Sequence, residues 1–220
     1  MVESLAAARI SLPFADTQIA SIHMGYSHNF FAIDIERLQS VHGSKDHDLL
    51  RKVLKDHADD VEDNDAFFEE EIEEGEMPNT ATALRQIFEG EIQSNVEGAM
   101  YGYALQMIAD QMGQLVEGGE YGVGAVRDQP FHSLLLQSGV PISIPLPSDF
   151  PEIGFLSRDQ ISDELQRARN YKHNLGPDST LTPYQQRMAE SEEIIDDVHA
   201  YIETLEKAQA IGLGLISFRH

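Results

Sequence analysis

The sequence of 220 residues has no cysteine. The lack of thiols excludes disulfide bonds, thiolate zinc sites, iron–sulfur clusters and cysteine nucleophiles. It also favours a reducing compartment, so we expect a soluble protein located in the cytoplasm. No motif in the chain suggests a cofactor.

Basic residues are scarce: 15 Lys and Arg stand against 38 Asp and Glu, which gives a formal net charge of -23. Such a charge repels the phosphate backbone of nucleic acids and the anionic surface of a membrane. We therefore expect neither as a partner. The charge favours a basic protein surface as partner, although a solvated face that keeps the protein soluble is the simpler alternative.

The first twenty residues contain neither a basic leader nor an unbroken apolar run, because Glu3, Arg9 and Asp16 interrupt them. This pattern fits neither a signal peptide nor a membrane span. We interpret residues 1–24 as an N-terminal tail and residues 25–220 as a single α+β domain. Met24 is an alternative start, which would leave residues 1–23 outside the native product.

The hydrophobic pattern predicts a small sheet of about three strands covered by several helices. The strands are expected over residues 30–35, 140–144 and 213–218, where apolar and β-branched residues cluster. Polar caps predict helices that begin after Asp34, Asp46, Asn79 and Ser157. Further helices are expected over residues 103–115 and 131–139, and a long C-terminal helix runs from Pro183 to about Gly212.

The segment from Asp56 to Glu76 is strongly acidic, with few apolar residues. These apolar residues (Val61, Phe67, Phe68 and Ile72) suit one narrow face of a helix, so we expect the segment to dock partly on the domain. Its aspartates lack the glycine and distal glutamate of a calcium loop, and we predict no metal site.

The stretch from Ile144 to Phe155, which we call the strap, is dense in proline and apolar residues. Proline stiffens the backbone, so a strap of this kind either staples the fold or shapes a site. The neighbouring aromatic residues either pack in the core, which is their commoner role, or line a pocket. The candidate binding residues are Tyr101, Tyr103, Asp149 and Phe150.

Catalytic motifs are missing from the sequence, which contains neither an HExxH pair nor a GxSxG elbow. The glycine-rich segment Gly118–Gly124 lacks the lysine of a phosphate-binding loop, follows a predicted helix, and is interpreted as a flexible connector. These observations favour a protein that is not an enzyme.

Several segments carry a resemblance to a known family. They are FFEEEIEEGE, ALRQI, YGYAL, PLPSDFPEIGFLSRDQI and the terminal GLISFRH. In this order they resemble an uncharacterised bacterial domain family, over roughly residues 26–220. The resemblance implies membership of that family and supplies no activity, cofactor or catalytic residue.

Two functions remain open. The leading hypothesis is a non-enzymatic binding or regulatory module whose acidic face meets a basic protein surface, and salt should weaken such binding steeply. The alternative is a small-molecule-binding domain or enzyme, with a pocket between the strap and the Tyr101–Tyr103 helix and Glu or His as acid–base groups. The sequence leaves the ligand, the partner and the oligomeric state open.

Overall fold

Helices and one antiparallel sheet make up the computed structural model, which describes residues 26–121, 135, 138–173 and 192–220. The strands are β1 (Tyr26–Ile33), β2 (Gln114–Tyr121), β3 (Glu152–Leu156) and β4 (Gly214–Arg219). The helices are α1 (Ile35–Gln39), α2 (His47–Asp56), α3 (Ala58–Phe67), α4 (Glu69–Glu73), α5 (Thr80–Glu89), α6 (Ala99–Met112), α8 (Arg158–His173) and α10 (Glu192–Ile211). The predicted α+β class is confirmed, with four strands in place of about three.

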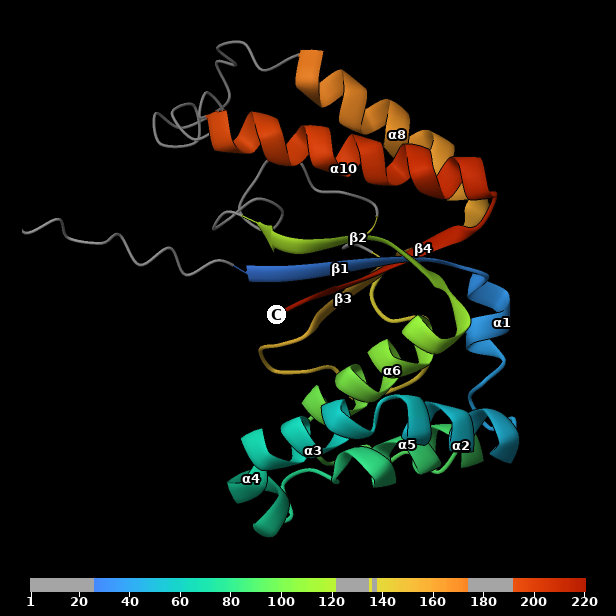
Figure 1. The fold of residues 1–220 in the computed structure, drawn as a ribbon, viewed down its shortest axis with the longest axis vertical. Helices are drawn as coiled ribbons and strands as arrows, with labels where there is room; N and C mark the ends of the chain where they lie inside the picture. Colours follow the sequence, from blue (N-terminus) through green and yellow to red (C-terminus); the bar gives the residue numbers. More distant parts are fainter. Residues whose placement is uncertain (1–25, 122–134, 136–137, 174–191) are drawn as a thin grey trace, which may run out of the picture.

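The sheet has the strand order β2-β1-β4-β3, and every neighbouring pair is antiparallel. Helices α1 to α6 lie on one side of it, and α8 and α10 lie on the other (Figure 1). Successive side chains of a strand point to opposite faces, so Phe31 and Ile33 join the first core while Phe30 and Ala32 join the second. The second half of β1, Phe30–Ile33, is therefore apolar at every position.

The two outer strands differ from the sequence-based expectation. The predicted strand over residues 140–144 is wrong, because Ile142 and Ile144 are buried in the core from irregular backbone. The third segment of the sheet is instead β3, which is the end of the strap. The predicted helix over residues 103–115 ends at Met112, and the chain then turns at Gly113 into β2.

Part of the segment interpreted as a glycine-rich connector also belongs to the sheet. Gly118 and Gly119 lie within β2, opposite Asn29 and His28 of β1. This edge strand is weak by composition, since glycine offers no side chain to pack against its neighbours. Pairing with β1 stabilises β2, and this long-range contact cannot be predicted from the sequence pattern of β2 alone.

The helix caps read from the sequence are confirmed for three helices. The side chains of Asp34, Asp46 and Asn79 each accept backbone N–H groups in the first turn of α1, α2 and α5. The α5 helix ends at Gly90, whose positive φ of 74° suits a residue without a Cβ atom. These caps are local interactions, so sequence spacing is enough to find them.

The acidic segment forms α3 and α4 and docks partly, as expected. Val61, Phe68 and Ile72 pack against the core on the α1–α6 side of the sheet. Phe67 does not share that face, because its side chain is 78% exposed.

Several predictions fall outside the described residues. They concern the tail of residues 1–24, most of the helix expected over 131–139 and the first part of the long C-terminal helix. Within the described part of the chain, no helix is both long and apolar enough to cross a membrane.

Candidate functional site

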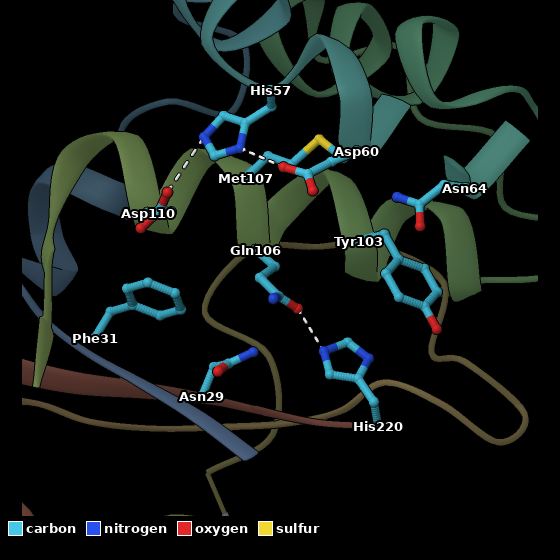
Figure 2. A pocket seen from close by; sticks show the side chains of 10 residues that line it. All are labelled: Asn29, Phe31, His57, Asp60, Asn64, Tyr103, Gln106, Met107, Asp110 and His220. Atoms are coloured by element: carbon cyan, nitrogen blue, oxygen red, sulfur yellow. Dashed lines mark hydrogen bonds and ion pairs between the residues drawn. The ribbon is translucent and has the colours of Figure 1, made fainter. Parts of the chain in front are cut away.

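Two cavities lie beside α6. The sheet cavity, of about 370 Å³, is enclosed by residues of β1, α3 and α6 (Figure 2). The strap cavity, of about 550 Å³, lies between α3, α4, α6 and the strap. Tyr103 and His220 line both cavities, so this pair stands at their common border. Volumes of this size are typical of small-molecule sites.

The strap is seated on α6 through two glycines, Gly98 and Gly102, which are one helical turn apart. A Cβ atom at Gly98 would lie 2.3 Å from the carbonyl oxygen of Pro145, and one at Gly102 would lie 2.6 Å from Cγ of Pro151. The backbone N–H of Ser148 donates to Oε1 of Glu97 at 2.8 Å. Close contact and this hydrogen bond hold the strap as one wall of the cavity.

Aromatic rings form much of the strap cavity. They are Phe67, Phe68, Tyr103 and Phe150. Phe67 and Phe68 meet edge to face at 4.8 Å between centroids, and Phe68 lies 5.7 Å from Tyr103 at an interplanar angle of 55°. The rings therefore stand at steep angles to one another instead of in one stack.

Carboxylates make up most of the polar lining of the same cavity. They are Glu71, Glu76, Glu97 and Asp149. Among the described residues that line it, none is Lys or Arg. The cavity thus combines apolar rings with negative charge.

Tyr103 and His220 form a stacked pair, with ring centroids 5.2 Å apart at an interplanar angle of 22°. Burial raises the pKa of Tyr103, and the nearby charge of Asp149 raises it further. Burial lowers the pKa of His220 to about 4. Both rings are consequently neutral at pH 7, and the imidazole of His220 contacts Oε1 of Gln106 at 2.6 Å.

In the sheet cavity, His57 is held between two carboxylates. Its Nδ1 lies 2.8 Å from Asp60, and its Nε2 lies 3.4 Å from Asp110 on α6 (Figure 2). The ring joins α3 to α6 in this way. Both of its nitrogens face side chains of the protein, so neither is directed freely at a ligand.

The four candidate binding residues fall into two groups. Tyr103, Asp149 and Phe150 come together at the strap cavity, at the place where a pocket was expected. Tyr101 lies apart, because its side chain is fully buried in the core. Its hydroxyl donates to Gln86 and accepts the backbone N–H of Gln93. On a helix, side chains two positions apart point to different faces, which separates Tyr101 from Tyr103.

Sequence reasoning missed several lining residues, including Phe67, Glu71, Glu97 and His220. Phe67 offered no clear signal, because two adjacent residues can both lie on the apolar face of a helix. His220 offered none, because its position depends on β4 lying beside β1. Among the described residues, no three His, Asp or Glu side chains are grouped to hold a metal ion.

The structure is an antiparallel α+β fold with two ligand-sized cavities on the α1–α6 side of its sheet. Residues 24–220 match the family described as "Domain of unknown function (DUF7691)", and the chain belongs to it. The resemblance to an uncharacterised domain family is thereby confirmed. Comparison with curated proteins and with solved structures gave no match in either case.

Proposed function

We propose that the protein is a binding module that takes up its ligand in the strap cavity. The observation that carries the proposal is the cavity of about 550 Å³, built by side chains from segments far apart in the sequence. Apolar rings that supply contact area, with a few polar groups that orient the ligand, are the usual composition of such sites.

Binding is favoured over catalysis by the state of the acid–base groups nearby. His57, the histidine with the closest carboxylate partners, is engaged at both ring nitrogens. Glu97 accepts the backbone N–H groups of Ser148 and Ala99, so it holds the strap. A bacterial source, implied by the family resemblance, and a cytoplasmic location, expected from composition, remain predictions.

A thermal-shift screen tests the proposal, using a panel of metabolites, nucleotides, organic amines, divalent cations and short arginine-containing peptides. A ligand at a hundred times its Kd adds ~2.7 kcal/mol to stability, or roughly 5 to 10 °C in Tm for a chain of this length. We expect Phe150→Ala to abolish the shift. Leu146→Ala is the matched control, because Leu146 lies on the same strap, is 68% exposed and does not line the cavity.

The screen can contradict the proposal in two ways. If no compound or peptide stabilises the wild-type protein, the strap cavity is a packing feature and not a binding site. If a ligand stabilises the wild type and Phe150→Ala equally, the ligand binds elsewhere.

A second candidate function is recognition of a basic protein surface by the acidic face of α4. Glu69, Glu70 and Glu73 are exposed on this helix, and the neighbouring Phe67 adds an apolar group to the charged face. Binding of a lysine-rich peptide should then weaken steeply between low and high salt, because exposed charges are screened. It should also weaken in Glu70→Gln/Glu73→Gln and persist in Phe150→Ala. The opposite pattern would assign the peptide to the strap cavity.

A further inference from the structure

We infer that the strap cavity recognises an organic cation, an alkylammonium or guanidinium group held between aromatic rings and carboxylates. The inference rests on the proposed function and names the chemistry of its ligand. Exposed phenylalanines and acidic residues are each common on protein surfaces, so the inference depends on their occurring together around one cavity.

The arrangement of the rings is the first step. Phe67, Phe68 and Tyr103 follow one another around the cavity at interplanar angles of 83° and 55°. The three rings do not cover one another face to face, and His220 stacks on Tyr103, so phenyl and phenol groups border the cavity at several orientations. The negative face of an aromatic ring attracts a cation within about 6 Å of its centroid, and such cages recognise quaternary ammonium groups.

The charge of the lining is the second step. Glu71, Glu76 and Asp149 line the cavity together with Glu97, and no described lining residue is Lys or Arg. The low pKa of His220 keeps its ring neutral at pH 7, so it does not offset this charge. A phosphate or carboxylate ligand would be repelled here, whereas a cation gains from rings and carboxylates together.

The third step concerns Phe67, whose ring is 78% exposed although it lines the cavity. A leucine at this position would keep an apolar side chain but remove the π face. Phe67→Leu therefore separates cation–π attraction from apolar contact, and its exposure makes the substitution easy for the fold to accept.

Isothermal titration calorimetry with choline tests the inference. The control ligand is the neutral isostere of choline, in which a carbon atom replaces the nitrogen. A short peptide with one central arginine tests whether the cation is supplied by a protein. We expect choline, the peptide or both to bind the wild-type protein. If choline binds, the isostere should bind at least tenfold more weakly than choline. Binding of the peptide alone would support the inference and identify a protein side chain as the source of the cation.

Two substitutions and one control variant complete the test. Phe67→Leu should weaken binding by about two- to fivefold, as expected for one exposed cation–π contact. Glu71→Gln should weaken it also, while Glu73→Gln makes the same change of charge on the same helix away from the cavity. Equal effects of the two glutamine substitutions would overturn a specific site in favour of diffuse attraction.

Failure of this inference and failure of the proposed function are distinguishable. If the isostere binds as tightly as choline, or if no cation binds, the cation assignment is wrong. The proposed function then still stands if another compound of the thermal-shift panel stabilises the wild type and not Phe150→Ala. If nothing in that panel binds, both are wrong.

Discussion

His28 and His220 are histidines that the fold keeps neutral near pH 7. His28 is 2% exposed on β1, and burial lowers its pKa to about 3, with the charges of Arg219 and His220 acting in the same direction. Burial alone lowers the pKa of His220 to about 4. Each group is therefore protonated in the unfolded chain at a pH where the native ring still carries no proton.

This difference predicts a loss of stability in mild acid. As pH falls below the ordinary histidine pKa of about 6.5, these histidines bind protons in the unfolded state but not in the native state. Unfolding therefore becomes more favourable. One such histidine contributes up to ~1.4 kcal/mol per pH unit, down to its native pKa. Urea unfolding at several pH values should show a shallower dependence for His28→Leu than for the wild type. The test compares how steeply the free energy of unfolding changes with pH, so a difference in absolute stability between the two proteins does not affect it. Equal slopes would show that His28 is accessible to protons in the native state.

The contact between α6 and the strap depends on the missing side chain of Gly98. Its φ of -82° is ordinary for any residue, so alanine there brings no backbone strain. In an open position such a change would stabilise the protein by about 0.4–1 kcal/mol. The carbonyl oxygen of Pro145 stands where the new methyl group would lie, and backbone atoms cannot move aside as a flexible side chain can.

We therefore predict that Gly98→Ala destabilises the protein by roughly 1–3 kcal/mol and loosens the strap. Limited proteolysis should cut the variant faster within residues 144–151, and calorimetry should record the lower Tm. Gly102→Ala should also destabilise the protein, because the ring of Pro151 is closed onto the backbone and cannot rotate away from the new methyl group. A stabilising effect of Gly98→Ala would mean that the strap does not rest on α6 in solution.

The molecule as a whole has two cores that share one sheet. On β4, Leu215 packs with α8 and α10, while the next residue, Ile216, packs in the core on the other side. Both cores include side chains of the sheet, so unfolding of one core also removes packing contacts from the other core. That residues 25–220 form a single domain stays a prediction, which unfolding experiments can test.

We expect one cooperative unfolding transition, in which Leu215→Ala and Ile216→Ala each lower stability by about 2–5 kcal/mol. Both side chains are fully buried, so each substitution leaves a cavity. Urea unfolding followed by circular dichroism and by tyrosine fluorescence should give coincident curves for all three proteins. Separate midpoints, with one variant shifting only one of them, would show that the two sides unfold independently.

Sequence reasoning succeeded wherever the decisive interaction is local. The cap at Asn79 and the stop at Gly90 define α5 within a few residues, because a helix end is satisfied by its own neighbours. The second half of the central strand β1 was also found, because Phe30–Ile33 is a continuous apolar run buried on both faces. Of the candidate site, Tyr103, Asp149 and Phe150 were placed together because proline-rich backbone and an adjacent aromatic helix are visible in the sequence.

By itself the sequence determined the α+β class, the negative charge and the starts of α1, α2 and α5. The tertiary structure alone decided that β2 and β3 are strands, because a weak or proline-flanked segment becomes a strand only when a partner offers its backbone hydrogen bonds. It also brought His220 to Tyr103 and Phe67 to the cavity wall. Cavities form between elements, and their composition depends on which elements meet, which no local pattern specifies.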